Sequence, residues 1–281
     1  MNKAEILVVG VVYNTYPETL RYLDSFIIPD TGNITLVLVD NSSCEKPQGF
    51  MEKINSYPFL DYIETGNNPG YFGGARVGIE HYLSRHATYP EWVLVTNVDI
   101  VFEPRFFTRL SELAADETLG VVAPSIISDK WKTDYNPGLM VRYSGGRLKF
   151  YHLLYSSVVL HNLFLIAAYT KMWLAKIFRE KREVAEGKGS RNKKMYASHG
   201  SCMIFNRNYF SRGGDLDLPN FLYGEEIHVA EHALRAGLAI EYHPELVIHD
   251  FEHASTGFFV TSATNRFNRQ AVRAILDRYY R

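Results

Sequence analysis

Asn97 and Asp99 could carry chemistry, because they flank Val98 directly after the apolar run Trp92 to Thr96. Carboxylates at the end of a buried strand can hold a divalent cation. Mg²⁺ typically takes one or two carboxylates together with phosphates of a substrate. Turn chemistry is the plain alternative for an isolated Asn-x-Asp pattern. The residues alone leave a cation site and a turn both open.

Two adjacent acids, Glu225 and Glu226, stand at the predicted start of a helix. One of them could act as a general base, although the helix dipole also favours acids in a first turn for purely structural reasons. His249 follows a short apolar strand and is a candidate metal ligand, with other titratable groups nearby at Asp250, Glu252 and His253. A lone histidine at a strand end is more often structural.

A glycine-rich loop spans residues 68–76, with the sequence Asn-Pro-Gly-Tyr-Phe-Gly-Gly-Ala-Arg. It opens a predicted helix. Glycines allow close backbone approach, and the N-terminus of a helix favours phosphate. No Gly-Lys-Ser/Thr follows, so the loop is not a Walker motif, and it is not a Gly-x-Gly-x-x-Gly pattern either. By itself the loop is a weak indication of phosphate binding.

Alternating strands and helices in the first 125 residues must position these groups. The pattern predicts a mainly parallel sheet with helices on both faces. The expected strands are 6–13, 34–40, 60–64, 92–96 and 120–123, and the expected helices are 17–26, 48–56, 72–85 and 104–115. Ligands bind beyond the carboxyl ends of the strands in such sheets. Four polar clusters follow those ends, so we expect one ligand-binding edge: Tyr13-Asn14, Asp40-Asn41-Ser42, Asn67-Asn68 and Asn97-Val98-Asp99.

The second half is less regular. Residues 138–150 hold three glycines and predict a hairpin, 151–186 predict a long helical stretch, and 187–194 predict a basic loop. The remaining expected elements are strands at 201–206, 238–242 and 246–249, and helices at 225–236 and 264–280. No internal repeat is visible.

Composition narrows the class of protein. The 281 residues are 46% hydrophobic and 22% charged, as in an ordinary globular protein. A net charge of −1 argues against nucleic acid as a partner. The two cysteines, Cys44 and Cys202, exclude a disulfide scaffold and a four-cysteine zinc site. The apolar run from Ile6 to Val12 is not followed by the small-residue cleavage site of a signal peptide. We therefore expect a cytoplasmic protein, with peripheral attachment at the inner face of the cell membrane as a further expectation, and a homo-oligomer is compatible with the sequence.

Taken in order, the motifs resemble those of an inverting glycosyltransferase of family two with the GT-A fold, in its rhamnosyltransferase-like branch. The resemblance spans nearly the whole chain, and it is specific through the order and spacing of its parts. The matching segments are Val12-Tyr13-Asn14, Val39-Asp40-Asn41-Ser42-Ser43, Asn68 to Gly74, Thr96-Asn97-Val98-Asp99, Gly200 to Ile204, Phe221 to Glu226, and Val247-Ile248-His249.

The resemblance implies a nucleotide-sugar donor, a divalent metal (Mg²⁺ or Mn²⁺) and a hydroxyl acceptor. It implies one continuous domain with a nucleotide-sugar-binding half at 1–125 and an acceptor-binding, catalytic half at 126–281, which includes an apolar and basic helical insertion at 150–194. The resemblance implies nucleoside contact by Asp40, a base pocket lined by Tyr13 and Asn14, and diphosphate contact by Asn68 and Gly70. Asn41 and Asn97 would also contact the donor. Metal binding would fall to Asp99 and His249, and catalysis to Glu226 with Glu225 beside it.

The chain departs from the family pattern at three places. Asn97 stands where many relatives have Asp, Arg76 stands where Asn is expected, and the acid pair is Glu-Glu rather than Glu-Asp. Asn97 offers only a neutral carbonyl, so we expect weak metal affinity without the nucleotide.

The expected reaction is metal-dependent transfer of a sugar to a glycan or a lipid-linked glycan in cell-surface polysaccharide synthesis. Rhamnose from dTDP-rhamnose is favoured, and a UDP-hexose is the next candidate. A nucleotidyltransferase and a non-catalytic nucleotide-sugar-binding protein are the alternatives. The former usually has a basic residue early in the glycine-rich loop, where this chain has only Arg76.

Phe150 to Thr170 contains no Asp, Glu, Lys or Arg over 21 residues, which is long enough to cross a bilayer. Five polar side chains interrupt this stretch. A single crossing there would also place Asp99 and Glu226 on opposite sides of the membrane, so we do not expect a transmembrane helix. Residues 171–194 follow with nine basic and three acidic side chains. We expect the pair of segments, 151–194, to contact an anionic membrane surface in the plane of the membrane. A core or dimer helix with a solvated tail is the alternative.

Overall fold

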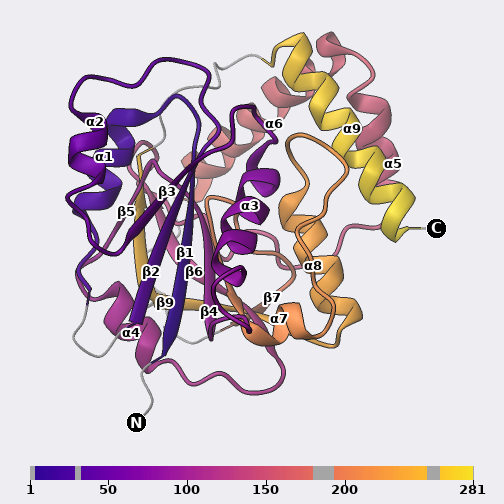
Figure 1. Cartoon of the computed structure of the whole chain (residues 1–281). Coiled ribbons are helices and arrows are strands. Elements are labelled where there is room, and N and C mark those ends of the chain that lie inside the picture. Colours follow the sequence, from indigo (N-terminus) through magenta and orange to yellow (C-terminus); the bar gives the residue numbers. More distant parts are fainter. Residues whose placement is uncertain (1–3, 29–32, 180–192, 252–259, 281) are drawn as a thin grey trace. The chain divides into compact units, whose positions relative to one another are not determined.

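A computed structural model describes residues 4–28, 33–179, 193–251 and 260–280 (Figure 1). Contacts divide the chain into two compact units. The first comprises Met1–Arg142, Asn192–Phe221 and Glu225–His253, and the second comprises Tyr143–Arg191, Leu222–Gly224 and Ala254–Arg281. The predicted boundary near residue 125 falls inside a strand of the first unit. The division into two functional halves stays a prediction.

Within the described residues, the first unit is built on one nine-stranded sheet in the order β3-β2-β1-β4-β8-β6-β9-β5, with β7 paired to β9. Its strands are β1 Glu5–Val12, β2 Asn33–Asp40, β3 Leu60–Glu64, β4 Trp92–Asn97, β5 Ile100–Phe102, β6 Leu119–Ser128, β7 Lys193–Met195, β8 Cys202–Asn206 and β9 Ala239–Asp250. The helices of this unit are α1 Tyr16–Asp24, α2 Phe50–Ile54, α3 Tyr71–Leu83, α4 Phe106–Glu112, α7 Arg207–Ser211 and α8 Glu225–Arg235.

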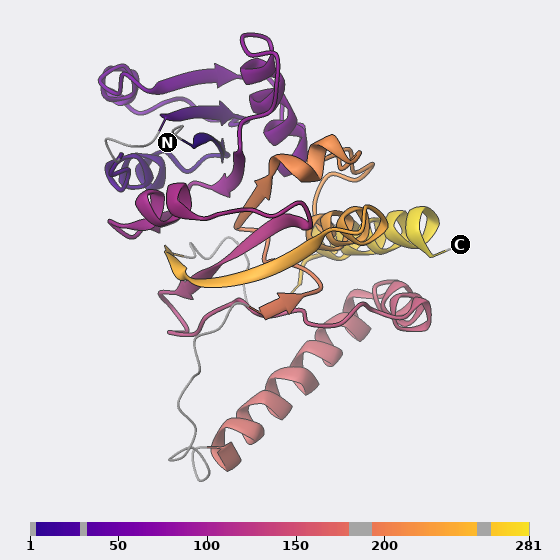
Figure 2. The ribbon, with the colours of Figure 1, turned by 90° about the horizontal axis from the view of Figure 1, so that it is seen from below.

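Both faces of the sheet are buried because apolar residues run continuously through β1, β2 and β4. Ile6 and Val8 point to a core shared with α1, α2 and α4. Leu7 and Val9 point to a second core shared with α3, α7 and α8. Figure 2 shows α1 and α2 on one side of the strands and α3 on the other. The predicted α/β class, with helices on both faces, is confirmed.

The strand ends meet at one edge, as predicted. β3, β2, β1 and β4 run parallel and adjacent. Asp40 pairs with Val12 on one side and with Glu64 on the other, while Asn97 pairs with Val11. The polar residues that follow these strands therefore leave the sheet from the same edge.

The other part of the sheet is mixed. β8 is antiparallel to β4 and β6, β9 is parallel to β6, and β5 and β7 are antiparallel to β9. The two short strands predicted at 238–242 and 246–249 form one strand, β9. A register shift against β6 between Pro124 and Ser125 accommodates the intervening residues. This bulge explains why an interrupted apolar pattern still forms one strand.

The hairpin predicted at 138–150 is wrong. Residues Gly145–Leu154 form helix α5, because the Ser144 side chain caps its first turn by accepting a hydrogen bond from the Arg147 amide. The helical stretch predicted at 151–186 is also interrupted. α5 ends at Leu154, and α6 spans Val158–Arg179, so residues 155–157 break the helix. Residues 180–186 and most of the basic loop at 187–194 lie outside the described residues.

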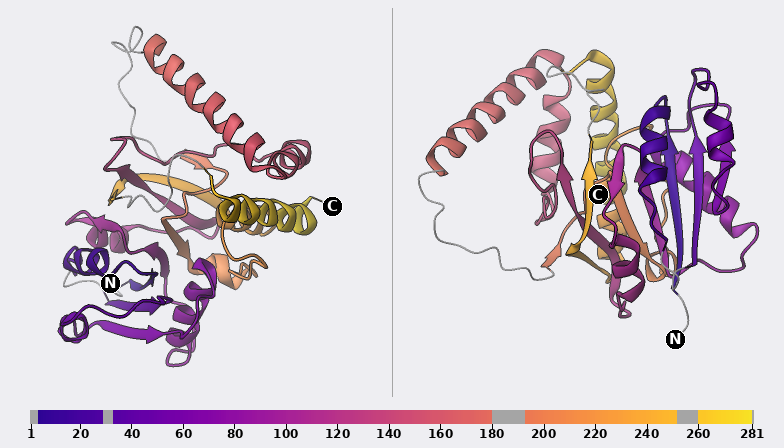
Figure 3. Two further views of the ribbon diagram at one scale, coloured as in Figure 1. Left: turned by 90° about the horizontal axis from the view of Figure 1, so that it is seen from above. Right: turned by 90° about the vertical axis from the view of Figure 1, so that its left-hand side faces the viewer.

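The second unit contains α5, α6 and the closing helix α9 Ser262–Tyr279. Both α5 and α6 contact α9, and Figure 3 shows α5 beside α9. Among the described residues, each helix alone is too short or too polar to cross a membrane. Gly145–Leu154 and Val158–Ala168 meet the length and composition requirements as a pair, with a bend of 118° between them.

Candidate functional site

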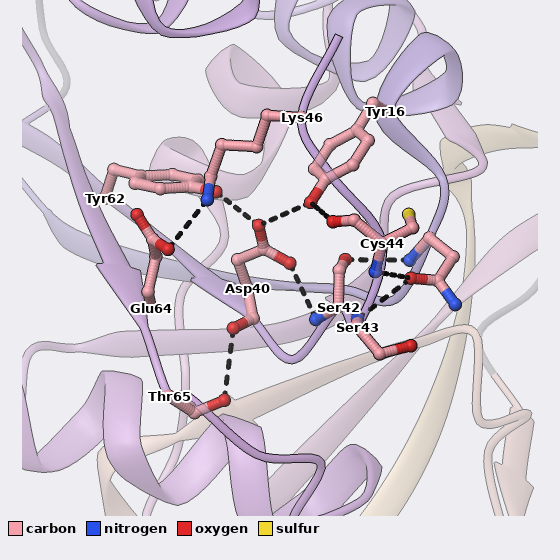
Figure 4. A network of polar contacts seen from close by, with 10 residues as sticks. Tyr16, Asp40, Ser42, Ser43, Cys44, Lys46, Tyr62, Glu64 and Thr65 are labelled. Carbon is pink, nitrogen blue, oxygen red and sulfur yellow. Dashed lines mark hydrogen bonds and ion pairs between the residues drawn. The ribbon is translucent and has the colours of Figure 1, made fainter.

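Asp40 is the centre of a polar network at the end of β2 (Figure 4). Its carboxylate is 4% exposed and accepts hydrogen bonds from the Tyr62 hydroxyl, the Tyr16 hydroxyl at 3.2 Å and the Ser42 amide at 2.8 Å. Burial and the bond to Asp40 raise the pKa of Tyr62 well above its ordinary value. Three neutral donors thus hold the carboxylate in one orientation. Glu64, and more weakly Tyr16 and Asp40, raise the pKa of Lys46, so a cationic side chain also lies near this network.

Asn14 ties β1 to the segment that follows Asp40. Its side-chain oxygen accepts hydrogen bonds from the amides of Ser43 and Cys44, and its own amide donates to Ser42 Oγ at 2.8 Å. These bonds hold Asn14 at a left-handed φ of 57°. The neighbouring Tyr13 ring is 49% exposed and is available to a planar ligand. The structure therefore places Tyr13, Asn14 and Asp40 together, as the sequence predicted.

The glycine-rich loop is held by Asn41 and Asn68. Buried Asn41 donates to the Gly70 carbonyl at 3.1 Å, and Asn68 Oδ1 accepts from the Gly70 amide at 3.0 Å. Gly70 has a φ of 83°, and a Cβ there would lie 2.3 Å from the Phe221 carbonyl oxygen. Only glycine fits this position. The loop leads directly into α3, whose free amides are suited to an anion.

Gly200 joins this loop to the acidic start of α8. The Tyr71 hydroxyl donates to the Gly200 carbonyl at 2.9 Å, and burial raises the pKa of this half-buried tyrosine. A Cβ on Gly200 would lie 2.9 Å from Glu226 Oε1, so the Glu226 carboxylate rests against the backbone of Gly200. Glu225 is 8% exposed, whereas Glu226 is partly exposed. Of the two predicted acids, Glu226 is the one more open to an incoming hydroxyl.

His199 and Ser201 extend the cluster on either side of Gly200. The His199 Nδ1 lies 3.1 Å from Ser201 Oγ, and its ring stacks on Tyr135 at 4.7 Å. Burial lowers the pKa of His199, and the charge of Glu226 opposes that shift. The sequence analysis did not single out His199, which lies next to the Gly200 motif.

Asp99 and Asp250 form an acid pair beside this segment. The Ser201 carbonyl accepts from the Asn97 amide at 2.9 Å, and the Asp99 carbonyl accepts from the Phe251 amide at 3.0 Å. Burial and, less strongly, the charge of Asp99 raise the pKa of Asp250 to about 6, against the opposing effect of a hydrogen bond from Ser201. Asp250 was not among the predicted site residues, although it follows His249 directly.

His249 lies on the other face of β9. Neighbouring residues of a strand point to opposite faces, and His249 is 41% exposed where Asp250 is buried. The His249 Nε2 lies 3.6 Å from Glu103 Oε1. Its role as a metal ligand stays a prediction, and so do the roles of the other predicted site residues.

The residues present fit a divalent cation of the Mg²⁺ and Mn²⁺ class. Carboxylate oxygens are the ligands these ions prefer. Asp99 and Asp250 are close enough for one charge to raise the pKa of the other group, and a cation between them would relieve that repulsion. Arg76, the basic residue of the loop, is engaged elsewhere, because its guanidinium meets Asp217 at 2.6 Å.

The acid pair predicts a pH dependence of stability. In metal-free protein we expect the free energy of unfolding to fall as pH rises from about 4 to about 6. The native state holds the Asp250 proton to about pH 6, above its ordinary value of 3.8, so the native state binds more protons than the unfolded state in this window. Each pKa unit corresponds to about 1.4 kcal/mol, so the loss from Asp250 is about 3 kcal/mol.

Urea unfolding in a chelating buffer across this pH window measures the effect. The Asp250→Asn variant lacks the titrating group, so its free energy of unfolding should fall less between pH 4 and pH 6 than that of the wild type. Identical pH profiles for the two proteins would contradict the coupling.

The profile of the family described as Glycosyl transferase family 2 matches residues 7–214. A low-salt glycan biosynthesis hexosyltransferase of Haloferax volcanii is 25% identical over 75% of this chain and 56% of its own length. An N-acetylglucosaminyl-diphospho-decaprenol L-rhamnosyltransferase of Mycobacterium tuberculosis is 24% identical over 89% of this chain and 77% of its own length.

Two solved structures share the fold. GalNAc-T7, crystallised with UDP, GalNAc and Mn²⁺, superposes with a TM-score of 0.61 at 14% identity, over 99% of this chain and 49% of that protein. The mannosyltransferase PcManGT of Pyrobaculum calidifontis, with GDP-Man and Mn²⁺, gives a TM-score of 0.52 at 16% identity, over 91% and 59% of the two chains. The chain thus spans about half the length of each of these neighbours. The predicted GT-A fold is confirmed, and the family profile covers most of the sequence: the chain belongs to glycosyltransferase family 2.

Proposed function

We propose that this protein is an inverting glycosyltransferase that moves a sugar from a nucleotide-sugar donor to a hydroxyl group with the help of a divalent metal. The observation that carries the proposal is the position of residues 199–201. This segment contacts the Glu226 carboxylate on one side and lies beside the Asp99 and Asp250 pair on the other. A candidate base and a candidate metal-binding acid pair therefore share one short segment.

The donor would lie along the edge formed by β1, β2 and β4. Asp40 has neutral hydrogen-bond donors around it and can accept a further bond from a nucleoside, beside the exposed Tyr13 ring. The loop around Gly70 leads into α3, and the start of that helix would face the diphosphate.

The chemistry follows from these positions. The acceptor hydroxyl attacks the anomeric carbon from the face opposite the nucleotide, and Glu226 takes its proton. A bound Mg²⁺ or Mn²⁺ would neutralise negative charge on the departing diphosphate. One displacement inverts the anomeric configuration, so Glu226 needs only to reach the hydroxyl and forms no covalent bond to the sugar.

Relatives support the choice of donor and acceptor. The mycobacterial relative is named as a rhamnosyltransferase acting on a lipid diphosphate-linked sugar, which favours dTDP-rhamnose and a lipid-linked glycan. The haloarchaeal relative is named as a hexosyltransferase, which keeps UDP-hexoses as the second choice. Thermal-shift measurements with a panel of nucleotide sugars and Mn²⁺ would identify the donor. Release of nucleoside diphosphate would then support transfer, formation of nucleoside triphosphate on addition of pyrophosphate would favour a nucleotidyltransferase, and binding without either product would favour a binding protein.

Gly200 offers a test that separates the site from the fold. In Gly200→Ala the new methyl group meets Glu226 Oε1 at 2.9 Å, the flexible end of a side chain, so the carboxylate moves and the fold persists. A misplacement of about 1 Å can cost about 100-fold in rate. We expect at least about a tenfold loss of turnover with an unchanged melting temperature.

Gly146→Ala is the matched control, because its methyl group meets only Ser144 Oγ at 4.0 Å. Steady-state kinetics and thermal unfolding of both variants provide the readout. Wild-type turnover in Gly200→Ala would argue against Glu226 as the base.

We also propose that α5 and α6 bring the enzyme to the cytoplasmic face of an anionic membrane, where a lipid-linked acceptor would lie. The polar groups within the apolar stretch face their own unit: His161 Nδ1 lies 2.8 Å from Asn265 Oδ1, and Asn162 exchanges hydrogen bonds with the Val260 backbone. Apolar side chains remain exposed on the same helices, among them Leu153, Val159, Leu160, Leu163 and Ile166. The basic residues of 171–194 follow directly.

Vesicle sedimentation tests this attachment. We expect binding to phosphatidylglycerol-containing vesicles that weakens as salt rises, and little binding to pure phosphatidylcholine. The triple variant Leu153→Glu, Val159→Glu, Leu163→Glu should lose most of it. Leu234→Glu is the control, because Leu234 is an equally exposed leucine on α8 of the other unit. Equal binding by the triple variant and the wild type would overturn the proposal.

A further inference from the structure

Asp215, His228 and His232 form a cluster of metal-ligating side chains that the candidate active site does not use. His228 and His232 are four residues apart on α8, so they lie on the same face of that helix. Asp215 belongs to the segment after α7, and all three residues lie in the first unit. Asp215 precedes His228 by more than ten residues, so the cluster joins α8 to a separate segment of the chain.

The distances within the cluster suit one small cation. The His228 Nε2 lies 3.1 Å from Asp215 Oδ1, and the His232 Nε2 lies 3.6 Å from Asp215 Oδ2. One ligand atom from each residue lies within 4.8 Å of the others. A tetrahedral Zn²⁺ with bonds of about 2.0–2.1 Å separates its ligand atoms by about 3.3 Å. Small side-chain rotations are therefore enough to place all three atoms around an ion.

Neighbouring groups already hold the cluster in place. The Asp215 carboxylate accepts a hydrogen bond from the Asp217 amide at 2.8 Å, and its carbonyl accepts from the Tyr209 hydroxyl at 3.1 Å. The His228 side chain is fully buried against Phe72, whereas 41% of the Asp215 side chain is exposed. A buried imidazole beside a half-exposed carboxylate gives an ion both a fixed ligand and a path of entry.

We propose that Asp215, His228 and His232 bind one transition-metal ion of the Zn²⁺ type, with solvent in the remaining position. Two imidazoles and one carboxylate favour Zn²⁺, Co²⁺ or Ni²⁺ over Mg²⁺, which prefers oxygen ligands. The acid pair at Asp99 and Asp250 has the opposite preference. The two sites therefore select different ions, and the new site is not the one that would serve the donor diphosphate.

The ion would act as a clamp on the helix that begins with Glu225 and Glu226. It would cross-link α8 to the Asp215 segment through His228, which is two residues after Glu226. Because the native state brings these ligands together, ion binding would stabilise the native state by mass action. Without an ion, the His228 Nε2 is within hydrogen-bond distance of the Asp215 carbonyl at 3.0 Å and of its carboxylate. That purely hydrogen-bonded arrangement is the competing account.

Co²⁺ titration of the metal-free protein distinguishes the two accounts, because bound Co²⁺ is visible in absorption spectra. Excess Mg²⁺ is present to occupy the acid pair, and Cys44→Ser removes the exposed thiol. We expect one equivalent of Co²⁺ with d–d bands in the visible range, displacement by Zn²⁺, and a higher melting temperature with either ion. These readouts do not depend on activity or on a nucleotide sugar.

Two variants and one control decide the assignment. His232→Gln and Asp215→Asn should each weaken Co²⁺ binding at least tenfold. His81→Gln is the matched control, because His81 also faces an aspartate, Asp61 at 3.0 Å, but belongs to no cluster of three metal-ligating groups among the described residues. This variant should bind Co²⁺ as the wild type does. Asp215→Asn keeps the side-chain shape at a half-exposed position. Its Co²⁺ affinity can therefore be measured even if His232→Gln destabilises the fold. Absence of Co²⁺ binding by the wild type, or equal affinity in Asp215→Asn, would overturn the proposal.

Discussion

Replacing Asp99 with Asn is expected to reduce sugar transfer at least about a thousandfold while the protein stays folded. A metal that neutralises a departing diphosphate contributes several kcal/mol to the transition state, and Asp99 is the acid that the strand end of β4 offers it. Its neighbour Asp250 is buried, and burial together with the charge of Asp99 raises the pKa of that neighbour. Asp99→Asn removes half of this charge pair and with it most of the attraction for a cation.

The measurement is nucleoside diphosphate release at saturating donor and Mn²⁺, with Mn²⁺ affinity followed by calorimetry. Asp61→Asn is the control: Asp61 also carries a carboxylate close to other titratable groups, but it pairs with His81 and Arg85. It should keep full activity. Full activity of the wild type in excess chelator would contradict a metal role altogether.

Glu226→Gln is expected to lose at least about a hundredfold in turnover while the donor binds almost normally. Removal of a general base typically costs about 10²–10⁴-fold, and Gln keeps the shape of Glu without its basicity. The Glu226 carboxylate lies against Gly200 and is partly exposed, whereas Glu225 is buried, so only Glu226 is open to an acceptor hydroxyl.

Glu225→Gln is the matched control, with the same chemical change one residue away. Turnover and donor affinity of both variants separate the alternatives. If Glu225→Gln shows the large loss and Glu226→Gln does not, the base is Glu225. If neither does, the base lies elsewhere. The next acids, Asp215 and Asp217, are engaged by His228 and Arg76 respectively.

The edge of the sheet where we propose that the donor binds could be predicted from the sequence, because its signals are local. Apolar runs bounded by turn residues identify β1 to β4, and parallel strands bring Asn14, Asp40 and Asn97 to one edge whatever the details of packing. The order of the motifs then indicated the family, which the profile over 7–214 confirms.

Other features depend on pairings between distant residues or on competing local signals. Asp250 reaches Asp99 only because β5 pairs with β9, across about 150 residues of chain. Glu226 meets Gly200 through the packing of α8, which no periodicity specifies. The glycines at 145 and 146 resemble a turn, yet Ser144 caps a helix there. Local patterns identified the elements, and tertiary contacts decided these three features.

A single inverting transfer from a nucleotide sugar fixes the configuration of the anomeric carbon in the product. NMR spectroscopy of the product, formed from the donor that the nucleotide-sugar panel identifies, tests it most directly by reporting the anomeric configuration of the new bond. The account predicts a configuration opposite to that of the donor, with one nucleoside diphosphate released per bond and no product in excess chelator. A retained configuration, or sugar transfer without release of a nucleoside diphosphate, would contradict it.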